Sequence, residues 1–159
     1  RRVLFRSVDI IIQAFTKLPQ KRLNITSTGP DEKKLKQLAE GFANIQFTGD
    51  INDKELKNLI GNAIATIYIP KDEDFGMSAV ESMAAGKPVI GSGEGGLLET
   101  VIHGETGWLS SPNISVEELV QMLDAANPKL TRSMRFSCEK QATGFRTELF
   151  INKIKDSLR

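Results

Sequence analysis

The chain has 159 residues, of which 40% are hydrophobic and 26% are charged, and its formal net charge is +1. This size and composition are typical of one globular domain with a single buried core, and they exclude a disordered chain. The near-neutral charge argues against a nucleic-acid-binding protein, because such proteins normally carry a strongly basic face.

Strands and helices are expected to alternate along the chain. Short β-branched runs predict strands, and apolar residues at helical spacing predict helices. The expected strands are residues 23–26, 44–47, 64–69, 89–92 and 107–109, with the run at 64–69 fully buried. The expected helices are residues 8–18, 31–42, 78–85, 97–102, 115–123 and 145–158, with two more after Asn52 and from Pro128. This alternation predicts an α/β fold, a doubly wound parallel sheet with helices on both faces.

The first seven residues are expected to be the exit of a sheet strand whose main part is absent from the chain. We therefore expect one strand of the sheet to be missing or shortened, which would leave an edge or an unfilled position. Two helix starts carry the sequence of a capping box, Asn52 with Glu55 and Ser115 with Glu118.

The segment from Lys71 to Pro88 organises the chain. An acidic loop containing Glu73 follows the apolar run at 64–69 and leads through Phe75 and Gly76 into a short helix that carries Glu81. In an open parallel sheet such a loop lies at the carboxyl end of a strand, where ligands bind and where helix N-termini attract anions. The segment is therefore the leading candidate for a binding site.

Five segments in order resemble the C-terminal domain of the group-one retaining glycosyltransferases of the GT-B fold. The signature of that family is Glu-x7-Glu, which Glu73 and Glu81 match. The resemblance covers nearly the whole chain and implies a Rossmann-like domain that binds a nucleotide-diphosphate sugar, such as a UDP- or GDP-sugar. It implies no cofactor and no metal. The matching segments are residues 8–15, 47–50, 73–90, 95–99 and 104–107.

The resemblance also implies roles for single residues. Glu73 would be catalytic by holding a hydroxyl of the transferred sugar, and Phe75, Gly76 and Met77 would lie beside that sugar. Glu81 would accept hydrogen bonds from both ribose hydroxyls, which a carboxylate can do with charge-assisted bonds. The diphosphate would be bound by Arg1, Arg6, Gly95 and Gly96, and the nucleobase would lie near Gly49, Asp50 and Ile51.

The sequence departs from the family pattern near its start. Arg6 stands where the family has lysine, Leu4-Phe5 replaces proline-glutamate, and Ser27 stands where glycine is usual. Arginine can bind phosphate in a bidentate manner, so the exchange at Arg6 is chemically compatible with the role.

Structural alternatives stay open for several of these residues. Ser78 and Glu81 also form a capping-box pattern, and Glu73 could be a solvated loop acid. His103 is expected to be an exposed loop residue, and Cys138 a structural one. A single histidine and a single cysteine exclude the usual zinc sites and an internal disulfide.

We expect residues 1–159 to form a single donor-binding domain. Its partners would be a nucleotide sugar and the N-terminal acceptor domain of the same enzyme, and not a nucleic acid. The apolar runs are too short to span a bilayer and no signal-peptide pattern opens the chain, so a cytoplasmic protein is expected, with membrane contact left open. The isolated chain should transfer little sugar or none.

Three alternative functions remain from the sequence. Two are other GT-B enzymes, a sugar-nucleotide epimerase and half of a glycoside phosphorylase. The third is a non-catalytic module that binds nucleotide sugars. The sequence leaves open the nucleobase, the sugar, the acceptor and the oligomeric state.

Overall fold

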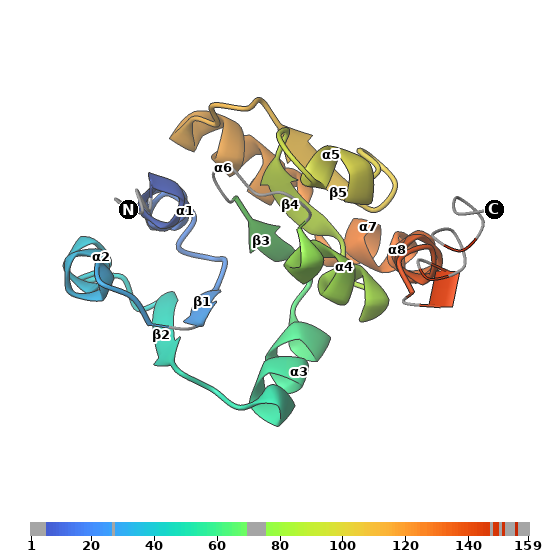
Figure 1. The fold of residues 1–159 in the computed structure, drawn as a ribbon. Helices are drawn as coiled ribbons and strands as arrows, with labels where there is room; N and C mark the ends of the chain where they lie inside the picture. The colour runs from blue at the N-terminus through green and yellow to red at the C-terminus, as the bar shows by residue number, and fades with distance from the viewer. Residues whose placement is uncertain are drawn as a thin grey trace.

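The computed structural model describes residues 6–26, 28–69, 76–146, 148–149, 151 and 155, with the backbone alone at Arg6 and Ser7. Its helices and strands alternate as the sequence predicted (Figure 1). The strands are β1 (Leu23–Thr26), β2 (Ile45–Gly49), β3 (Thr66–Tyr68), β4 (Val89–Ser92) and β5 (Gly107–Ser110). The helices are α1 (Arg6–Thr16), α2 (Glu32–Leu38), α3 (Asp53–Asn62), α4 (Met77–Ala84), α5 (Leu97–Thr100), α6 (Val116–Ala125), α7 (Pro128–Ser133) and α8 (Arg135–Thr143).

Every strand pair is parallel, and the strands fall into two sheets. One sheet is the pair β1-β2, and the other has the order β3-β4-β5. Each of the first four strands is followed by a helix, which is the pattern of βαβ units. The fold is the expected Rossmann-like α/β arrangement, but the sheet is interrupted between β1 and β3.

Two apolar clusters hold the elements together. The first joins α1 and α6 to strands of both sheets through Ile12, Phe15, Leu23, Ile90 and Leu119. The second packs α4, α5 and α8 around β4, and the fully buried Met83, Val89, Leu97 and Cys138 belong to it. Helix α1 is therefore the element that ties the β1-β2 pair to the larger sheet.

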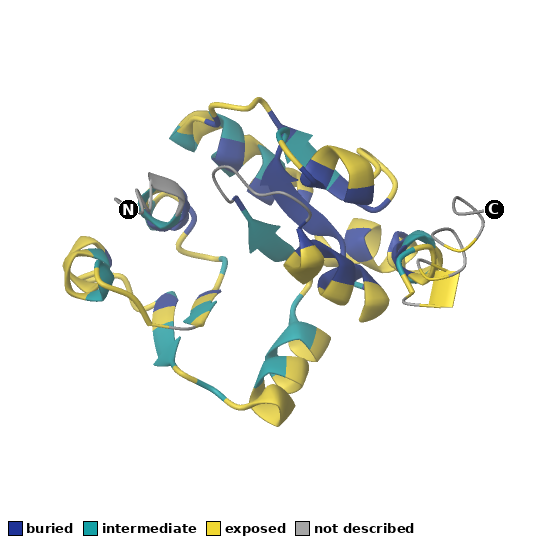
Figure 2. Cartoon of the chain, viewed as in Figure 1, coloured by how far each residue is buried: buried dark blue, intermediate teal, exposed yellow. Residues whose placement is uncertain are grey.

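Burial differs sharply between neighbouring strands (Figure 2). All four residues of β4 are buried, whereas all three residues of β3 are only half-buried. The prediction of a fully buried strand at 64–69 was therefore wrong, because β3 is shorter than expected and lies at an edge of its sheet. Helix α3 is amphipathic, yet none of its residues is buried.

Of the two capping boxes that the sequence predicts, only the one at α3 forms completely. At α3 the Asn52 side chain accepts from the Glu55 N–H, and Glu55 accepts from the Asn52 N–H, so the full box forms. At α6 the Ser115 hydroxyl accepts from the Glu118 N–H. The Glu118 carboxylate instead accepts from the N–H and hydroxyl of Ser111, each at 2.7 Å, so the reciprocal half of that box was predicted wrongly.

The start of the chain also differs from the expectation. Arg6 and Ser7 belong to α1, so these two residues are not the exit of a strand. Residues 1–5 lie outside the described part of the chain, as do most residues of the helix expected at 145–158.

Replacing Gly107 with alanine should destabilise the protein strongly. The added methyl group would collide with the Val89 carbonyl and lie 2.8 Å from the Val89 nitrogen, and Gly107 pairs with Val89 in the β4–β5 register. Because these are backbone atoms of a buried strand, we expect the free energy of unfolding to fall by more than about 2 kcal/mol in chemical denaturation.

Gly61→Ala is the matched control. Gly61 lies in α3, where no atom would come within 4 Å of an added methyl group. Because alanine favours helix over glycine, this change should stabilise the protein by about 0.5–1 kcal/mol. Equal effects of the two substitutions would contradict the close approach of β5 to β4.

Candidate functional site

Helix α4 begins at a glycine in the left-handed conformation. Gly76 has φ 76° and ψ 45°, and it is the N-cap of the helix. A methyl group there would lie 3.1 Å from Cδ2 of Leu97 and 3.8 Å from the Thr100 hydroxyl. The site thus requires glycine for its backbone angle, and the residue rests directly on α5.

The capping-box alternative for Glu81 does not hold in the structure. Ser78 lies inside α4 and makes no cap hydrogen bond, while its carbonyl accepts from the Ser82 hydroxyl at 2.9 Å. Glu81 is exposed, and its carboxylate has no hydrogen-bond or ion-pair partner among the described residues. A solvated carboxylate without a structural partner is available to a ligand.

One face of α4 gathers the groups that a polar ligand could use. Met77, Ser78 and Glu81 are all exposed, and residues three and four apart lie on one side of a helix. Among the described residues, the backbone N–H groups of Met77 and Ser78 have no acceptor. The carboxylate of Glu81 therefore stands one turn from two free donors at a helix N-terminus, where anions are favoured.

The start of α5 lies beside the start of α4. Gly95 has φ 54° and Gly96 is the N-cap of α5, which is a single turn long. The fully buried Leu97 connects the two helix starts. A Cβ atom added at Gly76 would lie in contact with the Leu97 side chain, and one added at Gly91 in β4 would lie 2.9 Å from it. The structure thus brings the start of α4, with Gly76 and Met77, close to the start of α5, with Gly95 and Gly96; their roles in binding stay a prediction.

The expected nucleobase residues lie at the carboxyl end of β2. Gly49 has φ 67° and ends the strand, and Asp50 follows it. The Thr28 hydroxyl donates to the Asp50 carboxylate, at 3.3 and 3.4 Å from its two oxygens. This hydrogen bond links the loops after β1 and β2. Sequence reasoning missed Thr28, although its place after a strand and before Gly29-Pro30 could have indicated it.

Two hollows of the surface lie near β1, β2 and α2. A hollow of about 130 Å³ at the carboxyl ends of β1 and β2 is lined by Thr26, Thr28, Leu35 and Phe47, among others. It lies beside the expected nucleobase residues, although none of them lines it.

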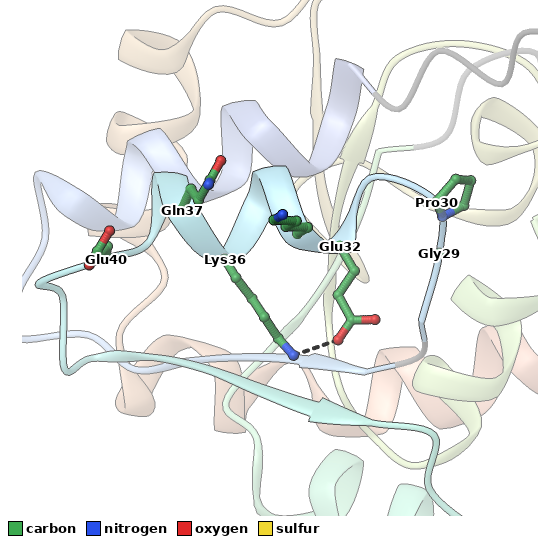
Figure 3. Close-up of a pocket in the computed structure, with 7 residues that line it drawn as sticks. Gly29, Pro30, Glu32, Lys36, Gln37 and Glu40 are labelled. Carbon is green, nitrogen blue, oxygen red and sulfur yellow. Dashed lines mark ion pairs between the residues drawn. The ribbon is translucent and has the colours of Figure 1, made fainter.

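A larger hollow of about 680 Å³ runs along α2, and none of the predicted site residues lines it (Figure 3). Its lining includes two glutamates and two lysines, and Lys36 pairs with Glu32 at 2.6 Å. Its charges balance, so it offers no particular attraction to an anion.

Several predicted site residues lie outside the described part of the chain. They include Glu73, Phe75 and Arg1, so the geometry of the Glu73–Glu81 pair stays a prediction. Arg6 is the first residue of α1, and its side chain is not described. The described residues of the loops after β3 and β4 include no lysine or arginine, while Lys71 of the loop after β3 lies outside the described part of the chain.

The other reactive side chains have structural roles. Burial raises the pKa of the Cys138 thiol to about 11, so the thiol stays protonated and unreactive at neutral pH. The exposed His103 ring accepts from the Leu109 N–H through Nδ1 at 3.1 Å. Within the described residues no cluster of His, Cys, Asp and Glu could hold a metal, and no helix is long and apolar enough to cross a membrane.

Comparisons with known proteins agree on one family. A family model described as glycosyl transferases group 1 matches residues 5–136. The alpha-1,3/1,6-mannosyltransferase ALG2 of Dictyostelium discoideum is 44% identical over 68 residues, which is 43% of this chain and 16% of the relative.

Solved structures give the same fold over nearly the whole chain. Sucrose-phosphate synthase from Thermosynechococcus elongatus matches with a TM-score of 0.79 at 25% identity, over 96% of this chain and 42% of that protein. Anabaena Alr3699/HepE, solved in complex with UDP, matches with a TM-score of 0.82 at 22% identity, over 99% of this chain and 46% of that protein. This chain thus spans less than half the length of each of these relatives.

Gly76→Ala should destabilise the protein, whereas Glu81→Gln should leave its stability nearly unchanged. Gly76→Ala should lower the free energy of unfolding by about 1–2 kcal/mol, because alanine is strained at φ 76° and its methyl group would crowd Leu97. Glu81→Gln should change it by less than about 0.5 kcal/mol, because the exposed carboxylate has no partner among the described residues. Chemical denaturation measures both. Because glutamine can still close a capping box, Glu81→Ala tests that alternative, and a loss near 1 kcal/mol for Glu81→Ala alone would indicate that the box forms in solution.

Proposed function

Because this chain belongs to the group 1 glycosyltransferases, we propose that it is the domain that binds a nucleotide-diphosphate sugar for transfer with retention of configuration. The donor would be a UDP- or GDP-sugar, and an N-terminal acceptor domain would complete the cleft of the enzyme. Two relatives support this class of ligand, since one is named a mannosyltransferase and another was solved with UDP.

The observation that carries the proposal is the exposed face of α4. Among the described residues, the carboxylate of Glu81 has no partner on this face, and the N–H groups of Met77 and Ser78 have no acceptor. A nucleotide sugar offers the matching groups, which are neighbouring ribose hydroxyls that donate and a diphosphate that accepts. Glu81 would take the ribose, and the helix N-terminus would take an oxygen-rich, anionic part of the donor.

The chemistry of transfer follows from these positions. The bond between the anomeric carbon and the diphosphate oxygen breaks, the acceptor hydroxyl oxygen bonds to that carbon, and the hydroxyl proton is released. Negative charge grows on the departing diphosphate, so the N–H groups at α4 and the Arg6 guanidinium would stabilise the transition state electrostatically. Glu73 would hold a hydroxyl of the sugar and so fix its orientation.

A non-catalytic binding module is the main alternative from another class. Such a module would have no use for a carboxylate reserved for the transferred sugar. A labelled nucleotide sugar incubated with the full-length protein distinguishes the outcomes, which are transfer, epimerisation or binding alone.

A calorimetric screen of UDP, GDP, the parent nucleosides and their sugars against this chain tests the proposal. We expect one nucleoside diphosphate to bind more tightly than its nucleoside, because the charged diphosphate adds the larger share of the interaction. That advantage should shrink as salt rises from about 10 mM to about 1 M, since the Debye length falls from about 30 to about 3 Å. Equal binding of nucleoside and nucleoside diphosphate at low salt would exclude a diphosphate site.

In the same calorimetric experiment, Arg6→Gln tests whether Arg6 supplies the positive charge that binds the diphosphate. The loss of a charged hydrogen bond of about 1.5–3 kcal/mol should weaken nucleoside diphosphate binding by roughly 10- to 100-fold and leave the nucleoside unaffected. A cation at a helix N-terminus does not stabilise the helix, so the variant should fold normally. Arg22→Gln, an exposed arginine before β1, is the control and should have no effect.

Variants of the two signature glutamates should separate the ribose from the sugar. Glu81→Ala removes two charge-assisted bonds and should weaken nucleoside diphosphate binding by on the order of a hundredfold or more. Glu73→Gln should leave nucleoside diphosphate binding nearly unchanged and, in the full-length enzyme, abolish most transfer. Glu40→Gln beside the α2 hollow is the matched control. If Glu40→Gln weakens binding and Glu81→Ala does not, the ligand binds along α2.

A further inference from the structure

Positive charge is gathered in the last part of the chain. Residues 127–159 contain eight lysines and arginines and three acidic residues, whereas residues 1–126 contain 13 and 17. The net charge of +1 is therefore the balance between +5 in the last segment and −4 before it. Such an asymmetry within a near-neutral protein indicates a surface for an anionic partner.

The structure places much of this charge on and beside α7 and α8. These two helices lie at the end of the domain opposite to β1, β2 and α2 (Figure 1). The one acidic residue in their sequences, Glu139, is already paired with Arg135 at 2.7 Å. Among the described residues, no carboxylate forms an ion pair with the other basic residues of this region, which are the exposed Lys129, Arg132, Lys140 and Arg146.

The most exposed large apolar side chain among the described residues also lies on α8. Phe136 is 75% exposed, and Leu130 of α7 is 38% exposed. The buried residues of α8 are Cys138 and Ala142, which are four apart and so mark the inner face of the helix. Phe136 and Lys140 are also four apart, and each precedes a buried residue by two positions, which puts them on the opposite face. The aromatic ring therefore points to solvent beside a cation.

Helix α7 has the same division between an inner and an outer side. Only Thr131 of this helix is buried, and the buried Met134 both ends α7 and begins α8. Both helices thus turn buried residues to the core and expose cations and apolar side chains outward. We call the exposed set the outer surface of α7 and α8, and it consists of Lys129, Leu130, Arg132, Phe136 and Lys140.

A bilayer with anionic lipids is the partner that matches both the cations and the apolar side chains of this surface. Its headgroups attract lysine and arginine, and the boundary between headgroups and acyl chains accepts exposed aromatic and aliphatic side chains. A second copy of this chain docked on the same surface would bring like charges together. A nucleic acid would attract the cations, but its phosphates and bases offer little to an aliphatic side chain such as Leu130.

We propose that the outer surface of α7 and α8 docks this protein reversibly onto a bilayer that contains anionic lipids. The Phe136 ring enters the headgroup region, and Lys129, Arg132 and Lys140 lie against the charged headgroups. One aromatic ring and a few cations give weak attachment, so binding depends on the anionic lipid and on salt. None of these residues belongs to the candidate donor site, so this surface is separate from it.

Sedimentation with lipid vesicles tests this proposal without any sugar nucleotide. At low salt the chain should bind phosphatidylcholine vesicles that contain about 30% phosphatidylserine and not vesicles of phosphatidylcholine alone. Binding should be lost at about 1 M salt, where the Debye length is about 3 Å. The double variant Arg132→Gln and Lys140→Gln should bind about 25-fold more weakly, because each cation near an anionic surface contributes about fivefold. Lys33→Gln with Lys34→Gln on α2 removes the same charge from exposed positions at the other end of the domain, and this control should bind like the parent.

Two variants of Phe136 test whether the ring enters the bilayer. Phe136→Gln keeps the net charge and should weaken vesicle binding by about tenfold, because the apolar contribution is lost. Phe136→Trp should shift its fluorescence emission to shorter wavelength when phosphatidylserine vesicles are added, with the parent, which has only Trp108, as the blank. All of these side chains are exposed, so the variants should keep the melting temperature of the parent.

Four outcomes would overturn the proposal. The first is no binding to phosphatidylserine vesicles at low salt, and the second is an equal loss of binding in the α2 control, which would indicate an effect of net charge alone. The third is full binding by Phe136→Gln together with an unshifted emission of Phe136→Trp. The fourth is displacement of the chain from the vesicles by a single-stranded oligonucleotide that binds it more tightly, which would assign this surface to a nucleic acid.

Discussion

The packing of Leu97 under the start of α4 is the contact on which the candidate site depends. The Leu97 side chain would lie 3.1 Å from a Cβ atom added at Gly76 and 2.9 Å from one added at Gly91. Only glycine at both positions lets α4 approach α5 and β4 so closely, and Gly76 also supplies the left-handed turn that begins α4. Because Leu97 is fully buried, the free N–H groups of Met77 and Ser78 are held at a fixed place above β3 and β4. These N–H groups are solvent-exposed, but the packing of Leu97 in the core fixes their position.

The same packing explains why Glu81 is available. A capping box at Ser78 would have used the Glu81 carboxylate to satisfy the helix start. Because Gly76 begins the helix earlier, Ser78 falls inside α4 and its carbonyl accepts from Ser82 instead. The carboxylate thus stands free on the exposed face of the helix, with no described partner to satisfy or displace.

Features determined by local sequence were predictable, and features determined by distant contacts were not. The strand at 89–92 and the Asn52–Glu55 box match the structure, because both depend on neighbouring residues. The half-exposed β3 was missed because its apolar sequence suits an interior strand, while burial depends on whether a neighbour is present. The partner of the Glu118 carboxylate was predicted wrongly, because Ser111, seven residues earlier along the chain, donates to this carboxylate in place of the Ser115 N–H. For the site, the sequence indicated that Gly76 and Gly96 each precede a helix, and both are helix N-caps in the structure. The pairing of Thr28 with Asp50 required the register of β1 and β2.

The interruption of the sheet and the proposed site bear on each other. The residues expected near the nucleobase, Gly49 to Ile51, follow β2, whereas Glu81 and the glycine-led helix starts belong to the sheet of β3, β4 and β5. The two halves of the proposed site therefore lie on different sheets. An apolar cluster that includes α1 connects them, and the Asn44 side chain before β2 also donates to the Phe15 and Leu18 carbonyls. Among the described residues, no ladder of hydrogen bonds joins β1 to β3. A ligand that needs both halves at once must also fix their relative position, and ordering that position opposes binding.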